Sequence, residues 1–179
     1  MSTIEATPIW LRNFEKFNGV KEIKGKIHAK EILELLDWAD GNHQDSKTLQ
    51  GIRDDETAYC SSALCGNFEM LGIQSTRNAM ARSWQNWGDM LGGPAVGAIV
   101  VFWRGDRNGT QGHVGIVVGR NSAGQLIVFG ANQDDQFKYS AFGVDRVLGY
   151  RWPAGQPKPT KVGFPKLPIT SASPSRSEA

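Results

Sequence analysis

The spacing of hydrophobic residues changes once along the chain, which predicts helices first and a sheet afterwards. Up to about residue 90, apolar residues recur every three or four positions, as they do in amphipathic helices. From residue 98 onward, short apolar runs alternate with polar turns, as is typical of strands. We expect helices at about 8–17, 29–39, 57–71 and 75–87, and strands at 98–103, 113–118, 125–129, 137–139 and 147–152. This order predicts an α+β fold with an antiparallel sheet of about five strands.

The strands at 113–118 and 125–129 are close enough in sequence to form a hairpin. The turn between them is Asn-Ser-Ala-Gly at 121–124. A turn centred there pairs residues whose numbers sum to 245, so Val118 would lie opposite Ile127. His113 would then face Asn132.

Cys60 lies at the start of the third predicted helix. Thr57 is the expected cap, after the acidic run 54–56, and this places Cys60 in the first helical turn. Unpaired backbone N–H groups and the positive end of the helix dipole favour a thiolate there. A single free cysteine is more often a small buried residue. The interpretation of Cys60 as a nucleophile therefore depends on His113 and Asn132 downstream.

The composition is that of an ordinary globular domain. The chain has 179 residues, of which 40% are hydrophobic and 21% charged, enough for one buried core. A net charge of +2 does not suggest nucleic-acid binding, and no apolar run is long enough to insert into a membrane. A monomer is expected. The first ten residues lack the pattern of a signal peptide, so we expect synthesis in the cytoplasm and delivery of the protein to any external substrate.

The last part of the chain differs from the rest. Six of the eight prolines lie at or beyond Pro153, together with serine, threonine and lysine. We therefore expect a catalytic domain at 1–153 and an extended or disordered tail at 154–179.

The sequence predicts no metal or cofactor. Cys60 and Cys65 are five positions apart and would point about 140° from each other on a helix, out of disulfide reach, so both are expected to be free. Neither forms a pair with zinc spacing. The segment 106–117 begins like a calcium loop, but it lacks glycine at its sixth position and glutamate at its twelfth.

Several motifs, taken together, resemble the papain-like cysteine hydrolases of the CHAP and NlpC type. The resemblance extends over about residues 9–153. It is carried by Tyr59-Cys60, Ala81-Arg82-Ser83-Trp84, the run 96–102, Gly112-His113-Val114-Gly115, Gly130-Ala131-Asn132-Gln133 and the run 149–153. It implies a helix with the nucleophile packed on an antiparallel sheet, and cleavage of amide bonds in bacterial peptidoglycan. Two positions depart from the family pattern: Tyr59 stands where tryptophan is common, and Ala131 where glycine is common.

The same residues suit that chemistry. Cys60 would be the nucleophile, His113 the general base and acid, and Asn132 the group that orients His113. The Cys60 backbone N–H is the best oxyanion donor, with Tyr59 as a second candidate. Trp84 and Trp103 are candidates for substrate contact, although spaced aromatic residues such as Trp84 are more often part of the core.

Three functions fit this prediction. The first is a peptidoglycan amidase or endopeptidase, either a phage endolysin or an antibacterial effector. The second is a non-catalytic wall-binding or phage-particle component with the same fold. The third is a cysteine peptidase that acts on protein.

Overall fold

The computed structural model describes residues 6–25, 28–41 and 59–174, and it has the predicted order of helices followed by a sheet. The helical elements before the sheet are α1 (Ile9–Glu15), α2 (Lys30–Gly41), α3 (Cys60–Glu69) and the 3-10 helix η1 (Ala81–Asn86). The strands are β1 (Asp89–Leu91), β2 (Ile99–Trp103), β3 (Gly112–Arg120), β4 (Leu126–Gly130), β5 (Lys138–Phe142) and β6 (Val147–Trp152). Two further 3-10 helices are η2 (Val144–Arg146) and η3 (Phe164–Lys166). The α+β class is confirmed.

The strands form one antiparallel sheet in the order β1-β6-β2-β3-β4-β5. Strand β1 is not among the predicted strands, because three residues before a Gly-Gly-Pro break are too few to show an alternating pattern. β2 and β3 lie in the middle of the sheet and are almost fully buried. The central position of β3 fixes the place of any side chain that it carries.

The β3–β4 hairpin has the predicted register at one end only. Ile116 pairs with Phe129 and Val117 with Val128, whose numbers sum to 245 as expected. The register then shifts, so that Ile127 pairs with Gly119 and the predicted partner Val118 is skipped. A bulge of this kind adds one residue to one strand and depends on tertiary packing, which explains why the simple count failed.

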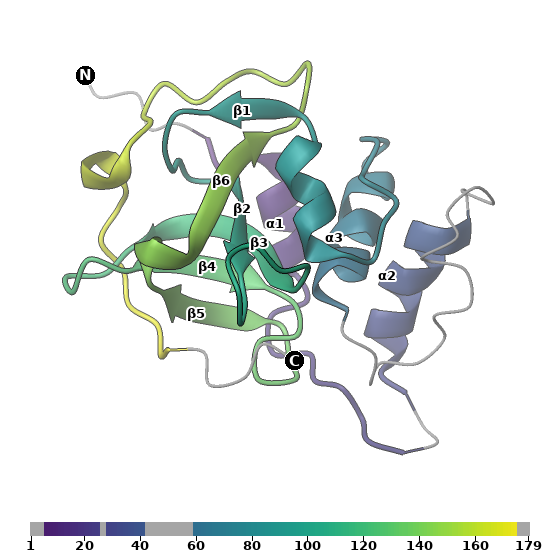
Figure 1. Cartoon of the computed structure of the whole chain (residues 1–179). Coiled ribbons are helices and arrows are strands. Elements are labelled where there is room, and N and C mark those ends of the chain that lie inside the picture. The colour runs from purple at the N-terminus through teal and green to yellow at the C-terminus, as the bar shows by residue number, and fades with distance from the viewer. Residues whose placement is uncertain (1–5, 26–27, 42–58, 175–179) are drawn as a thin grey trace.

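Helix α3 is the central helix of the fold. It packs against β3 on one side and against α2 on the other, and Figure 1 shows it between the sheet and α2. Every residue from Cys60 to Phe68 is buried, which is why the segment lacks a strong amphipathic pattern. Gly66 lets the two helices approach closely, since a Cβ atom there would collide with the backbone oxygen of Leu35. A buried helix that precedes the sheet and packs on it is consistent with the papain-like fold.

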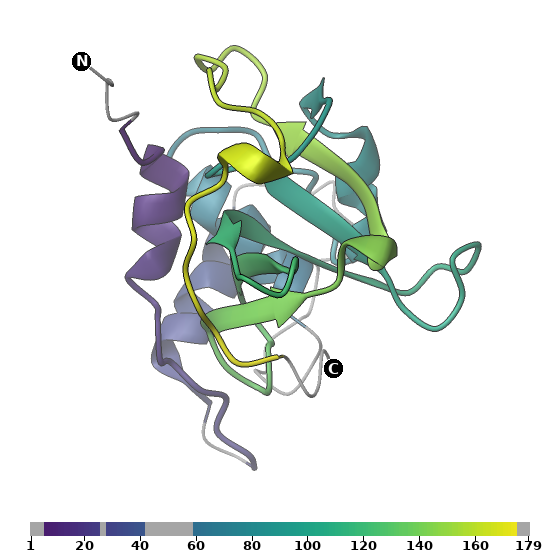
Figure 2. The same cartoon turned by 90° about the vertical axis from the view of Figure 1, so that its left-hand side faces the viewer.

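Beyond Pro153 the described chain runs extended along the sheet. Arg120 N donates to Pro168 O at 2.9 Å, and Thr170 N donates back to Arg120 O at 2.8 Å. Leu167 is buried, and Ala141 N donates to Ser173 O at 3.1 Å. Figure 2 shows this yellow segment crossing in front of the strands. The domain boundary at 153 stays a prediction.

Candidate active site

Cys60 is the first residue of α3, so it lies in the first helical turn as the sequence predicted, although the helix begins later than a cap at Thr57 would place it. Tyr59 is the residue before the helix, and its carbonyl accepts the first helical hydrogen bond, from Ala63 N at 2.8 Å. The predicted cap Thr57 and the acidic run 54–56 lie outside the described residues. Only 6% of Cys60 is exposed, so its thiol lies in a nearly closed position at the amino end of the helix.

The protonation of Cys60 differs from the expectation. Burial raises the pKa of the Cys60 thiol to about 11, because desolvation penalises the thiolate more than its surroundings favour it. The backbone N–H groups of Val114, Ser61 and Cys60 itself lower the pKa, as does the charge of Arg104. The helix terminus thus acts in the predicted direction, but burial outweighs it. At neutral pH the resting form is the thiol.

The contact with Val114 places the Cys60 thiol beside the start of β3. His113 precedes Val114 on that strand and pairs with Phe102 of β2. The imidazole is stacked with two rings: its centroid is 5.4 Å from that of Phe142 and 6.5 Å from that of Phe102. With 1% of the residue exposed, the ring is fixed by its surroundings. The structure therefore brings together the chain segments that carry the predicted nucleophile and the predicted base.

The hydrogen bond at His113 Nε2 is formed with Gln133. The distance from Nε2 to Gln133 Oε1 is 3.0 Å, and Gln133 is fully buried. Asn132, the residue predicted to orient His113, is also buried and has a left-handed backbone with φ of 57°. Its catalytic role stays a prediction. In the sequence, Gln133 is marked only by its place directly after Asn132 in the motif, and that place does not show which side chain faces the imidazole.

Arg82 holds the loop that leads into His113. Its Nε donates to Gln111 O at 2.8 Å, Nη1 to Arg107 O at 2.9 Å and Nη2 to Asp106 O at 2.8 Å. A Cβ atom on Gly112, the residue between this loop and His113, would lie 2.5 Å from Phe102 O and 3.2 Å from Arg82 Cγ. Arg82 belongs to a motif quoted above, but nothing in the sequence indicated this role.

The aromatic candidates have different surroundings. Trp84 is fully buried and its indole N–H donates to Ser61 Oγ at 2.9 Å, so no surface of the ring is available to a substrate. Trp103 is partly exposed, and its N–H donates to Asp145 O at 3.4 Å. Tyr59 is fully buried, with its ring centroid 5.8 Å from that of Phe137. The roles given to Trp103 in substrate contact and to Tyr59 in the oxyanion hole stay predictions.

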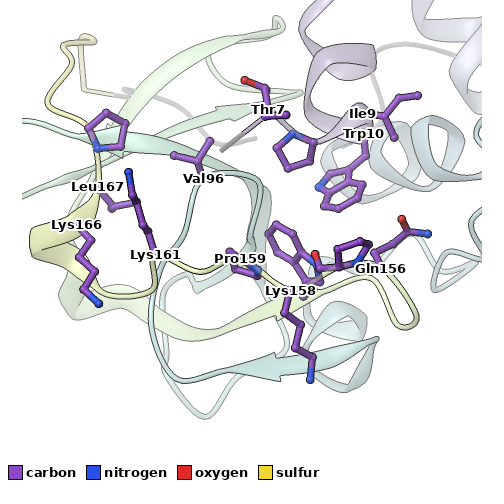
Figure 3. Close-up of a pocket in the computed structure, with 15 residues that line it drawn as sticks. Thr7, Ile9, Trp10, Val96, Gln156, Lys158, Pro159, Lys161, Lys166 and Leu167 are labelled. Carbon is purple, nitrogen blue, oxygen red and sulfur yellow. The ribbon is translucent and has the colours of Figure 1, made fainter. Parts of the chain in front are cut away.

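A pocket of about 720 Å³ lies elsewhere in the molecule. It is lined by the residues before and at the start of α1, by the end of β6 and by the tail, with Trp10 on one side and Lys161 and Lys166 on the other (Figure 3). None of Cys60, His113, Asn132 and Gln133 lines it. Its size alone does not make it the site of chemistry.

A buried thiol at a helix start, beside a strand that carries a hydrogen-bonded histidine, is compatible with the chemistry of a cysteine hydrolase. Comparison with known families agrees: the CHAP domain family model matches residues 52–132, a stretch that contains Cys60, His113 and Asn132. The match is consistent with a CHAP-type cysteine hydrolase. No curated protein matches the chain. Within the described ranges, no helix is long and apolar enough to cross a membrane.

Proposed function

We propose that the protein hydrolyses an amide bond in the peptide part of peptidoglycan, with Cys60 as nucleophile and His113 as general base and acid. The observation that supports this most directly is the position of the Cys60 thiol at the backbone of Val114, the residue next to His113. A phage endolysin or an antibacterial effector is the setting in which such a domain would meet the cell wall.

The raised pKa of the Cys60 thiol supports one order of events in the first step. Because the resting thiol is protonated, the proton passes to His113 as the sulfur attacks the carbonyl carbon, rather than before the substrate binds. The new S–C bond produces a tetrahedral oxyanion. The Cys60 backbone N–H, which has no partner within the helix, is placed to donate to it.

The remaining steps use the same two groups. The protonated His113 gives its proton to the leaving nitrogen as the C–N bond breaks, and a thioester remains on Cys60. Water then attacks the thioester, His113 accepts its proton, and the sulfur leaves with a proton from His113. The products are a new amine and a new carboxylate.

The bond type can be tested on purified sacculi. We expect the wild-type protein to release new amino groups without new reducing sugar ends, and mass spectrometry of the fragments should show cut peptides on intact glycan chains. A His113→Ala variant should bind sacculi but release nothing, since it lacks the base. Reducing ends alone would indicate a glycosidase instead. Binding by the wild type without any product would support a non-catalytic wall component.

A further inference from the structure

We propose that Gln133, rather than Asn132, is the positioning residue for His113, and that it holds the imidazole with its proton on Nε2. This inference rests on the proposed function, because it concerns the same base. It is carried by the buried 3.0 Å contact between His113 Nε2 and Gln133 Oε1. Nε2 carries at most one hydrogen, and this contact occupies it.

The orientation of the Gln133 amide follows from its other contacts. Its Nε2 lies 2.6 Å from Lys138 O and 3.4 Å from Val128 O. Backbone carbonyls only accept hydrogen bonds, so the NH₂ group must face them and the oxygen must face His113. An amide oxygen also only accepts. His113 must therefore donate from Nε2.

This hydrogen bond selects one tautomer of the neutral ring. With the proton on Nε2, Nδ1 is the unprotonated ring nitrogen, and it is the one that can accept the Cys60 proton. The opposite tautomer would leave Nε2 and Oε1 as two acceptors 3.0 Å apart in a buried site, which is unfavourable. The amide thus keeps His113 in the form that the proposed reaction requires.

The backbone around Gln133 supports this placement. Asn132, Asp134 and Asp135 all have left-handed backbones, with φ of 57°, 53° and 59°. Such conformations are costly for residues other than glycine, although Asn and Asp tolerate them best, and strained backbone often marks a functional site. Gln133 N also donates to Gln136 O at 3.0 Å, which closes the turn. The turn directs Gln133 into the protein.

The carboxylates of this turn have other partners. Asp134 Oδ2 accepts from Lys138 Nζ at 2.6 Å, and Asp135 forms an ion pair of 3.9 Å with Lys24. The charge of Arg104, in the loop after β2, lowers the pKa of Cys60. The acceptor in contact with His113 Nε2 is the neutral amide of Gln133.

Gly130 packs closely against the contact between Gln133 and His113 and leaves no room there for a side chain. A Cβ atom there would lie 2.7 Å from Gln133 Oε1 and 3.4 Å from His113 Nε2. Gly130→Ala should therefore displace the amide without removing any functional side chain. It is a second way to break the same contact.

The first test needs no substrate. In ¹⁵N-labelled protein, NMR of the His113 ring at neutral pH should show the proton on Nε2, protected from exchange. Gln133→Met, which is similar in length but offers no amide oxygen, should lose that protection and give mixed tautomers. Asn132→Gly keeps the left-handed backbone without the side chain and should preserve the wild-type signal. A wild-type ring protonated on Nδ1, or a signal unchanged by Gln133→Met, would overturn the proposal whether or not the protein cleaves peptidoglycan.

The second test uses cleavage of peptidoglycan. We expect Gln133→Met to lower kcat by roughly ten- to a hundred-fold with little change in KM, and Asn132→Gly to stay within about three-fold of wild type. Gln133→Glu can keep an oxygen toward His113, but its other oxygen would face the Lys138 carbonyl, which only accepts, so the carboxyl should stay protonated and recover only part of kcat. If Gln133→Met does not fold, Gly130→Ala provides the same comparison. A larger kcat loss in Asn132→Gly than in the Gln133 or Gly130 variants would return the role to Asn132.

Discussion

Helix α3 contains two cysteines in different surroundings. Cys60 lies at the amino end, where the backbone N–H groups of Ser61 and Val114 reach its sulfur. Cys65 lies in the middle of the helix and faces the segment after α3, with Sγ 3.6 Å from Thr76 Oγ1 and 3.8 Å from Asn78 O. Both are buried and free of disulfides.

The difference shows that burial alone does not define a nucleophile. Cys65 has no exposed surface, whereas Cys60 retains 6%. Cys60 is also next to the strand that carries His113. The partner groups and the access of a substrate, rather than the thiol itself, distinguish a reactive cysteine from a structural one.

The largest effect should come from exchanging the sulfur of each cysteine for oxygen. Cys60→Ser should lower kcat for peptidoglycan cleavage by about a thousand-fold or more, because the hydroxyl is a much poorer nucleophile than the thiol in this site. Cys65→Ser, the matched control, should stay within about two-fold, since its hydroxyl can still donate to Asn78 O. Release of amino groups from sacculi measures both. Equal losses in folded proteins would mean that the two surroundings do not differ in function.

A second effect concerns pH. Only the thiolate reacts with iodoacetamide, so below the pKa of about 11 the rate at Cys60 should rise about ten-fold per pH unit, or about a hundred-fold between pH 8 and pH 10. Mass spectrometry of the Cys65→Ser protein isolates this rate. Cys65, in the converse variant Cys60→Ser, should react more slowly because it is fully buried. A rate at Cys60 that levels off below pH 8 would indicate a thiolate–imidazolium pair formed before substrate binds.

Much of the fold could be predicted because its signals are local. The change of hydrophobic period at about residue 98 located the sheet, and the helix start placed Cys60 in a first turn. The spacing of the hairpin was correct for Ile116 and Val117. The bulge that follows depends on how β3 and β4 pack within the whole sheet, and no local pattern indicates it.

In the candidate site, too, the features with a local sequence signal could be predicted, whereas those that depend on tertiary packing could not. The sequence pointed to Cys60 and His113 because each lies at the start of a predicted element, and their catalytic roles stay predictions. The role of Asn132 in orienting His113, which stays a prediction, came from extending the hairpin as a regular strand. The left-handed backbone at Asn132 ends that regularity and turns the next residue, Gln133, toward His113. The sign of the pKa shift at Cys60 was equally out of reach, since desolvation depends on everything that packs around the thiol.

The smallest of the three effects on activity should come from substituting Arg82, near His113, or Thr76, beside Cys65. Arg82 joins three carbonyls of the loop before His113, whereas Thr76 contacts Cys65 and accepts from Ser83 Oγ at 2.9 Å. Arg82→Met keeps the aliphatic stem but removes all three donors, so the start of β3 loses its anchor. We expect kcat to fall about ten-fold, because a misplaced base lowers the rate without removing the chemistry.

Two controls separate positioning from stability in this comparison. Arg82→Lys keeps the charge but replaces the planar fork by a single ammonium, which cannot reach three carbonyls in the same geometry, so it should also lose activity. Thr76→Val removes a comparable polar contact beside Cys65 and should leave kcat within about two-fold of wild type. Thermal unfolding of all three variants shows whether a loss of activity merely follows a loss of fold. Full activity in Arg82→Lys would mean that the charge of Arg82, rather than its three hydrogen bonds, is what the reaction needs. An equal loss of kcat in Thr76→Val and Arg82→Met would mean that the surroundings of Cys65 matter to the reaction as much as the loop before His113.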